Sequence, residues 1–250
     1  MTPPAGPPLL EVRHLRKSFG AVQALKDLSM SLHPGEVVAL AGDNGAGKTT
    51  LIKAISGVYP PSGGEILLDG EPVAFASPQE ARARGIETIY QDLALADNLT
   101  IGANIFLGRE PMRRAFGVLP VIDRRRMADA ARETMALLDF HVSRMNAPVS
   151  NFSGGQRQAV AIGRAVYWNA RVLIMDEPTA ALGVPEQRKV IQLIHQLKAQ
   201  GRGVIFISHN LQDIFAVSDR IVVLRRGVMA GERRIGETSH EEVVRLMIGG

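Results

Sequence analysis

The order of hydrophobic and polar positions along the chain predicts an α/β fold. Residues Leu9–Leu15 alternate apolar and polar side chains, as a half-exposed strand does, and Leu25–Leu32 repeat that alternation less cleanly. Mostly apolar runs, typical of buried parallel strands, follow at Glu36–Ala41, Val172–Met175 and Val204–Ile207. Because helical segments alternate with these runs, we expect a mainly parallel sheet with an antiparallel β region near the N-terminus.

Turn residues and helix caps delimit the other elements of the predicted core. Proline begins two of the three predicted helices, and glycine occurs in the predicted turns. The predicted helices are Thr49–Ser56, Pro78–Arg84 (capped by Ser77) and Pro185–Gln200. The further predicted strands are Glu65–Leu68, Ile86–Tyr90 and a hairpin-like pair, Ile221–Leu224 and Val228–Glu232, around Arg226-Gly227.

The middle of the chain has a different character from about Asp97 to Asn169. Runs of β-branched residues disappear there, and alanine, leucine, methionine and arginine recur at helical spacing, most clearly in Arg124–Leu138. We interpret this stretch as an inserted helical subdomain. The predicted domain of residues 9–250 thus has a core of 9–92 and 170–250 and a helical subdomain of 93–169, and it is preceded by a flexible proline-rich tail of 1–8.

The composition excludes some classes of protein. The 250 residues are 46% hydrophobic and carry a net charge of +4, which is too small an excess to indicate nucleic-acid binding. Absence of cysteine fits a reducing compartment, and no apolar run is long enough to predict a membrane span. Five arginines concentrate charge in the middle of the chain, either on a solvated helical face or at a contact with phosphate or acidic lipid: Arg113, Arg114, Arg124, Arg125 and Arg126.

Residues Gly42–Thr49 form a glycine-rich segment that fits G-x-x-x-x-G-K-[ST] at every fixed position. Glycines let the backbone curl so that successive N–H groups point at phosphate oxygens, and the predicted helix that follows presents its positive N-terminal end. Lys48 can then reach the β- and γ-phosphates, and the Thr49 hydroxyl can bind Mg²⁺. The residues expected to bind the nucleotide here are Gly42, Asn44, Gly45, Ala46, Gly47, Lys48, Thr49 and Thr50.

Two carboxylates, Asp176 and Glu177, follow a strand that is predicted to be central in the sheet. Ligands of open α/β sheets collect at the carboxyl ends of the strands. Asp176 would hold Mg²⁺, directly or through water, and Glu177 would orient and deprotonate an attacking water molecule. The structural alternative for this pair is an acidic helix cap. Together with the phosphate loop, the pair indicates hydrolysis of a nucleotide.

Two further polar residues, Gln91 and His209, also come directly after predicted strands. Gln91 could contact Mg²⁺ or water, and His209 could hydrogen-bond the γ-phosphate. Each alone is more often an ordinary loop residue, but their common placement favours a role in the site. The expected catalytic residues are thus Glu177, His209 and Gln91, and the expected metal ligands are Thr49, Gln91 and Asp176.

These motifs, in this order, resemble the nucleotide-binding ATPase domain of an ABC transporter from about Leu9 to Gly249. Gly42–Thr49 matches the family's Walker A and Val172–Glu177 its Walker B, while Asn151–Gln156 matches its signature, with Asn-Phe where Leu often precedes Ser-Gly-Gly-Gln. Gln91 falls at the Q-loop and His209 at the switch histidine. Phe19 falls where the family places an aromatic residue that stacks on adenine, and a core aromatic is the alternative for it.

The resemblance gives the signature a physical role. Ser153, Gly154, Gly155 and Gln156 open a predicted helix, and in the family this end binds the γ-phosphate of an ATP held by the other subunit. The resemblance therefore implies a dimer, expected to be a homodimer, that closes around two ATP molecules with Mg²⁺. Gly183 departs from the family pattern, because many members carry an aspartate there that couples the two sites.

The sequence around the motifs resembles that of the ATPases of bacterial sugar importers, especially the ribose- and fructose-type branch. This implies an ATP-driven machine on the cytoplasmic face of the inner membrane that moves permease subunits, is served indirectly by a solute-binding protein, imports a monosaccharide and does not bind nucleic acid. The supporting segments are Ile89–Leu93, Asn98–Ile101, Asn104–Glu110 and Glu177–Leu182.

Three other readings share the catalytic motifs. An importer of amino acids, lipids or metals would use every catalytic residue. A non-transport protein acting on ribosomes carries two ATPase domains in one chain, whereas one phosphate loop is present here. A chromosome or repair ATPase separates Walker A from the signature by a long coiled coil, and no sustained heptads occur between them. The single phosphate loop and the short spacing favour the transport ATPase.

Overall fold

A computed structural model describes residues 6–116, 118–140 and 144–249. Most of the predicted tail, residues 1–5, lies outside the described residues. The chain divides into two compact units, each described here by itself. The first unit comprises Met1–Gln91, Ala170–Ala180 and Ile194–Gly250, and the second comprises Asp92–Asn169 and Ala181–Leu193. The segment 181–193 thus groups with the helical unit, although the sequence pattern assigns it to the core.

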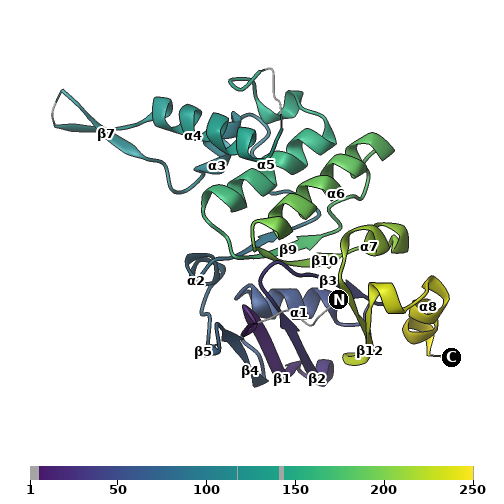
Figure 1. The fold of residues 1–250 in the computed structure, drawn as a ribbon. Coiled ribbons are helices and arrows are strands. Elements are labelled where there is room, and N and C mark those ends of the chain that lie inside the picture. Colours follow the sequence, from purple (N-terminus) through teal and green to yellow (C-terminus); the bar gives the residue numbers. More distant parts are fainter. Residues whose placement is uncertain (1–5, 117, 141–143, 250) are drawn as a thin grey trace. The chain divides into compact units, whose positions relative to one another are not determined.

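A ten-stranded sheet organises the first unit, in the order β5-β4-β1-β2-β12-β11-β3-β10-β9-β6 (Figure 1). Strands β11, β3, β10, β9 and β6 are parallel, while β5, β4, β1 and β2 are antiparallel, as the sequence predicts. The strands are β1 (Leu10–Phe19), β2 (Val22–Leu32), β3 (Val37–Ala41), β4 (Gly63–Leu68), β5 (Glu71–Val73), β6 (Ile86–Ile89), β9 (Val172–Asp176), β10 (Gly203–Ile207), β11 (Arg220–Arg225) and β12 (Val228–Arg234).

Burial explains why the central strands read as apolar runs. Every residue of β3 and β10 is buried, as expected for parallel strands of which both faces are covered. β1 is only half buried and alternates accordingly. The polarity of a residue on this sheet therefore depends on how many faces of its strand are covered. Polar side chains can reach solvent at the ends of the strands.

The helices of the first unit begin at side-chain caps or at the phosphate loop. They are α1 (Lys48–Ile55), α2 (Pro78–Ala83), α7 (Leu211–Val217) and α8 (His240–Ile248), with a 3₁₀ turn at Ile235–Glu237. Ser77 caps α2 by accepting a hydrogen bond from the amide of Glu80, which confirms the predicted cap. α6 (Val184–Ala199) contributes residues to both units. The sequence pattern does not predict α7 and α8, since helices of seven and nine residues offer little periodicity.

Three helices, α3 (Ile101–Ile105), α4 (Arg124–Leu137) and α5 (Gly154–Tyr167), form the core of the second unit, with a 3₁₀ turn at Val149–Asn151. Phe106 lies against the rings of Tyr167 and Trp168, with centroids 4.6 and 5.7 Å away. The fully buried amide of Asn104 accepts a hydrogen bond from the backbone of Ala96 at 2.7 Å. These contacts fix the loop that precedes α3 to the helical core.

Part of the predicted helical subdomain is instead a β-hairpin, and the prediction of an all-helical insertion is wrong there. β7 (Met112–Ala115) pairs antiparallel with β8 (Leu119–Ile122), as Figure 1 shows. Pro111 and Pro120 have no N–H group for a helical ladder, and the Val121-Ile122 pair favours an extended backbone.

Two of the five clustered arginines consequently lie on a strand. Arg113 and Arg114 are exposed on β7, so the interpretation of the cluster as a helical face is wrong for them. The other three arginines open α4 and are exposed, as a solvated helical face predicts. Among the described residues, no helix is both long and apolar enough to cross a membrane.

Candidate nucleotide site

The glycine-rich segment lies directly on the sheet at the carboxyl end of β3. Gly42 has a φ of 146°, and a Cβ atom there would come within 2.3 Å of the carbonyl oxygen of Leu224. Gly47 has a φ of 111°, and a Cβ atom there would lie 2.9 Å from Leu25 Cδ2. Only glycine fits both the left-handed backbone and the close approach at these two positions. The fixed glycines of the motif therefore have a local steric cause.

α1 begins directly after this loop and offers its N-terminal amides to a ligand. Gly47 is its N-cap residue and provides no side chain to cap the first turn. Thr49 is exposed and Thr50 is half buried at the same end. First-turn amides without a side-chain cap and the positive end of the helix dipole make this terminus suited to a phosphate group.

Lys48 keeps a positive charge close under the loop. It is 9% exposed, and its ammonium group donates hydrogen bonds to the carbonyl oxygens of Gly42 and, at 3.1 Å, of Asp43. Burial lowers the pKa of Lys48, while the carboxylates of Glu177, Asp176 and Asp43 act in the opposite direction. The group therefore has carboxylate partners that favour its charged form, and its hydrogen bonds to loop carbonyls can be exchanged for phosphate oxygens.

Strand register brings the predicted catalytic residues to one edge of the sheet. Ile207 of β10 pairs with Asp176 of β9, and Met175 of β9 pairs with Ile89 of β6. Glu177, His209 and the exposed Gln91 therefore follow the carboxyl ends of three neighbouring strands. This is the edge at which open α/β sheets bind their ligands.

Glu177 is held in an unusual backbone conformation. Its φ is 51°, in the left-handed region, and its amide donates a 2.9 Å hydrogen bond to the carbonyl of Ile207. A residue with a side chain rarely adopts this conformation, and such strain clusters at functional sites. His209 Nε2 lies 3.3 Å from the solvent-shielded Oε1 atom of Glu177, which accepts no hydrogen bond within the described structure.

Both carboxylates of the pair have raised pKa values. Burial is the main cause for each. Lys48 and His209 oppose the effect on both, because nearby cations favour the ionised form. Half-buried carboxylates with incomplete charge compensation are suited to bind a cation or accept a proton, and the two functions are the ones predicted for Asp176 and Glu177.

Phe19 ends β1 and is 43% exposed. Its ring meets that of Tyr59 edge-on, with centroids 5.2 Å apart, and the ammonium group of Lys17 lies 5.1 Å from its centroid. This exposure excludes the core-aromatic alternative. An exposed aromatic with a free face can stack on a base, so adenine stacking stays a prediction for Phe19.

The signature segment opens α5 in the second unit with a capping box. Ser153 Oγ accepts the amide hydrogen of Gln156 at 3.4 Å, and Gln156 Oε1 accepts that of Ser153 at 3.0 Å. These two bonds leave the amides of Gly154 and Gly155 as the N-terminal donors for an anion. The segment is thus a second helix terminus suited to phosphate.

The two signature glycines also allow a close approach by the segment after Glu177. A Cβ atom on Gly154 would lie 2.7 Å from Leu182 Cδ2, and one on Gly155 would lie 2.8 Å from Glu186 Cγ. Leu182–Glu186 therefore packs directly on the start of α5.

One positioning contact has no signal in the sequence. Thr179 Oγ1 donates a 2.7 Å hydrogen bond to Asp213 Oδ2, and both residues are buried. This bond ties the loop after Glu177 to α7, which follows His209. Since the two residues are far apart in sequence and no motif links them, only the fold shows that they meet.

Gly183 lies beside Glu186, and this gives a testable consequence. Its backbone is outside the left-handed region, and an added Cβ atom would lie 2.8 Å from Glu186 Oε2. Two carboxylates about 4 Å apart in water repel by about 1 kcal/mol, so we expect Gly183→Asp to lower the free energy of unfolding by about that amount. Glu186→Gln in the same chain should restore it. Urea unfolding of the four members of this cycle measures the effect, and equal losses with and without Glu186 would refute it.

The oxygen donors at the strand ends suit a magnesium ion. No group of three or more His, Cys, Asp or Glu residues able to hold a metal occurs in the described part of the chain. Mg²⁺ commonly takes only one or two protein ligands and completes its shell with water and substrate phosphates. A hydroxyl at Thr49, an amide oxygen at Gln91 and the undercompensated carboxylate of Asp176 match that preference.

A phosphate loop, a carboxylate pair after a central parallel strand and a second helix terminus for phosphate define a P-loop nucleoside triphosphatase. A sequence model of the family described as "ABC transporter" matches residues 25–180. The chain therefore belongs to the ABC transporter family, as an ATPase domain, and the predicted family and fold are confirmed.

Relatives with a described function are similar over most of the chain. The xylose/arabinose import ATP-binding protein of Sulfolobus acidocaldarius is 49% identical, over 96% of this chain and 93% of that protein. The fructose import ATP-binding protein of Rhizobium meliloti is 47% identical, over 88% and 86%. A ribose import ATP-binding protein of Rubrobacter xylanophilus is 48% identical over 97% of this chain, but the chain spans only 47% of its length.

Solved structures show the same fold. An ATP-binding cassette of an ABC transporter in its ADP conformation superposes with a TM-score of 0.83 at 26% identity, covering 98% of this chain and all of that one. A dimeric cassette in a post-hydrolysis state with ADP and phosphate has a TM-score of 0.74 at 25% identity, over 90% of this chain and 98% of that one. Nucleotide binding is thus established for domains of this fold and family.

Proposed function

We propose that this chain is the ATP-hydrolysing subunit that powers a monosaccharide importer. The observation that carries the proposal is its identity of 47–49% to three import ATP-binding proteins, named for xylose/arabinose, ribose and fructose, combined with the full set of expected catalytic motifs. Pentoses and a hexose occur among those relatives, so the proposal extends to the monosaccharide class and to no single sugar.

The residues of the first unit have separate roles in the binding and hydrolysis of ATP. The loop and α1 amides bind the phosphates, and Lys48 exchanges its carbonyl partners for phosphate oxygens. Glu177 orients a water molecule and accepts its proton, because it is a carboxylate with incomplete charge compensation at the ligand edge of the sheet. His209, 3.3 Å from Glu177, senses the γ-phosphate. Phe19 stacks on adenine.

Mg²⁺ fits the oxygen donors of Thr49, Gln91 and Asp176. When bound, the ion neutralises charge on the phosphate oxygens. The carboxylate of Asp176 is half buried, and its raised pKa reflects the cost of holding that charge without a full partner. A bound cation would therefore stabilise the ionised form of Asp176.

The functional unit in this proposal is a dimer. Ser153 and the amides of Gly154 and Gly155 bind the γ-phosphate of an ATP on the Walker A loop of a second subunit. A capped and exposed helix start supports this, and a cassette of the same fold is described as dimeric. ATP closes the dimer and hydrolysis reopens it. This cycle takes place on the cytoplasmic face of the membrane and moves a permease to which the dimer is bound. The second subunit is proposed to be another copy, and a solute-binding protein delivers the sugar.

The decisive test is transport by the complex with its native membrane partners. We expect proteins that purify with this chain from detergent-solubilised membranes to include a permease, identified by mass spectrometry. Vesicles containing that complex should take up a labelled pentose or hexose only with ATP and the binding protein. The Glu177→Gln complex is the matched control and should show no uptake. Uptake of an amino acid instead of any sugar would overturn the proposal.

A further inference from the structure

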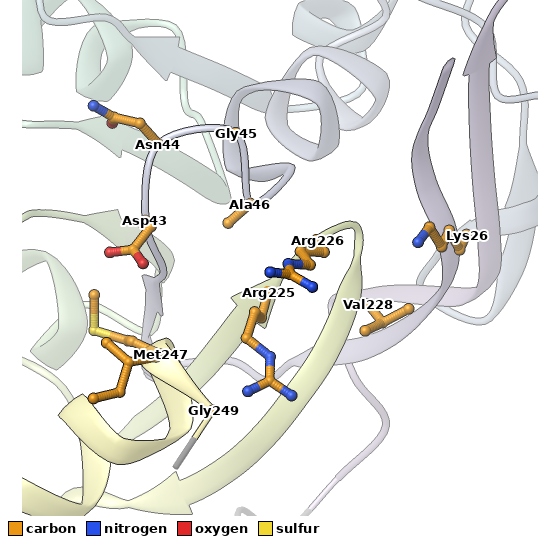
Figure 2. A pocket seen from close by; sticks show the side chains of 11 residues that line it. Lys26, Asp43, Asn44, Gly45, Ala46, Arg225, Arg226, Val228, Met247 and Gly249 are labelled. Atoms are coloured by element: carbon orange, nitrogen blue, oxygen red, sulfur yellow. The ribbon is translucent and has the colours of Figure 1, made fainter. Parts of the chain in front are cut away.

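A cavity of about 600 Å³ is lined on one side by the phosphate loop, including Asn44, Gly45 and Ala46 of the expected nucleotide site, and on its other sides by residues outside that site (Figure 2). One wall is the loop segment Asp43–Ala46. The others are Lys26 of β2, the β11–β12 turn at Arg225–Arg226, and the end of α8 at Met247–Gly249. None of Lys48, Thr49, Asp176, Glu177 or Phe19 lines it. Its size is that of a site for a small organic molecule.

The charge of this cavity is strongly one-sided. Lys26, Arg225 and Arg226 face one carboxylate, that of Asp43, which leaves an excess of two positive charges. Within the described structure, none of these three cationic side chains has an ion pair or a hydrogen bond. Figure 2 shows the guanidinium groups of Arg225 and Arg226 close to the β11–β12 turn, and Lys26 on the neighbouring strand. Unpaired cations gathered from distant parts of the chain predict an anionic ligand.

Arg226 has an unfavourable backbone conformation that packing of its side chain does not offset. Its φ is 50°, in the left-handed region where glycine, asparagine or aspartate is favoured in a two-residue hairpin turn. Its side chain is exposed and therefore gains little from packing. A strained residue whose guanidinium projects into a cavity is more consistent with ligand binding than with a role in stability.

The same turn is bonded to the phosphate loop. The amide of Gly227 donates a 2.9 Å hydrogen bond to the carbonyl of Ala46, and the amide of Lys26 donates one of equal length to Gly227. The carbonyl of Leu224 touches the base of the loop at Gly42. A ligand that draws Arg226 and Lys26 together would therefore act on the loop backbone through direct contacts.

We propose that this cavity binds a small organic phosphate in addition to the nucleotide, and that the two ligands change each other's affinity. A phosphate monoester carries close to two negative charges at neutral pH, which matches the excess charge of the lining. Guanidinium groups recognise phosphate oxygens by paired hydrogen bonds. Val228, Met247 and Ile248 provide apolar surface for a carbon skeleton. The site does not depend on which solute is transported.

Calorimetry on the full chain, with saturating ADP to fill the nucleotide seat, tests the proposal. The probe is ribose 5-phosphate, with ribose and succinate for comparison. We expect one additional site for ribose 5-phosphate and none for ribose. Arg226→Asn suits the left-handed turn and should leave the fold intact, yet weaken the probe at least about tenfold. Lys26→Gln should do the same, whereas Arg82→Gln, an exposed arginine of α2, is the control and should bind normally.

Reciprocity supplies an independent readout. The factor by which the probe changes the dissociation constant of ADP must equal the factor by which ADP changes that of the probe, and Arg226→Asn should abolish both. Absence of any binding at millimolar ribose 5-phosphate would overturn the proposal. So would unchanged binding by Arg226→Asn, or succinate binding as tightly as the phosphate.

Discussion

Replacing Glu177 with glutamine is expected to reduce ATP turnover by about 100- to 10,000-fold while ATP still binds. The amide keeps the size of the side chain but cannot accept a proton from water. The surroundings of Glu177 support this outcome, because its Oε1 atom is shielded, has no hydrogen bond in the described structure and lies 3.3 Å from His209 Nε2. Phosphate release measures turnover, and calorimetry measures ATP affinity.

Asp176→Asn is the informative comparison for this variant. It removes the neighbouring carboxylate, to which we assign Mg²⁺ binding, so its defect should weaken when the magnesium concentration is raised. The defect of Glu177→Gln should not respond to magnesium. Near-normal turnover in Glu177→Gln, or recovery of that variant at high magnesium, would remove Glu177 from the role of general base.

Replacing Ser153 with arginine is expected to abolish ATP-driven dimerisation without preventing ATP binding by the monomer. The arginine would fill the space in front of the Gly154 and Gly155 amides, where the partner's phosphate would enter in the proposed dimer. We expect light scattering to show a dimer for Glu177→Gln with ATP, since that background traps ATP, and only a monomer once Ser153→Arg is added.

The loss of the helix cap must be separated from the loss of phosphate contact. Ser153 caps α5, and losing such a cap costs about 1 kcal/mol. Ser153→Asp keeps a good capping residue but places a negative charge in front of the phosphate. It should therefore fold like the parent and still fail to dimerise. A dimer in either variant would refute the split site.

The sequence was sufficient for the parts of the site that depend on one strand and the loop after it. Glu177, His209 and Gln91 could be predicted to lie at one edge of the sheet because each follows a buried strand, and parallel strands end at the same edge. The antiparallel region and the parallel centre could be predicted from alternation and from apolar runs. These features are local, so the periodicity of hydrophobic residues along the sequence predicts them.

The features that could not be predicted depend on contacts between distant segments or on local conflicts. The β7–β8 hairpin lies in a stretch whose alanine and arginine content favours helix, and its two prolines and its turn decide the outcome. The cavity joins Lys26 to Arg225 and Arg226 across about 200 residues. Likewise, no periodic pattern in the sequence predicts the hydrogen bond between Thr179 and Asp213.

The packing of the signature glycines restricts how substitutions there can be interpreted. Gly154 and Gly155 make room for Leu182 and Glu186, and we also propose that their amides bind a phosphate. An alanine at either position would displace a segment that begins a few residues after Glu177. In the proposed dimer, its effect on catalysis would then combine two separate defects, one in the binding of the partner's nucleotide and one in the position of Glu177, the proposed general base. Each signature glycine is thus constrained twice.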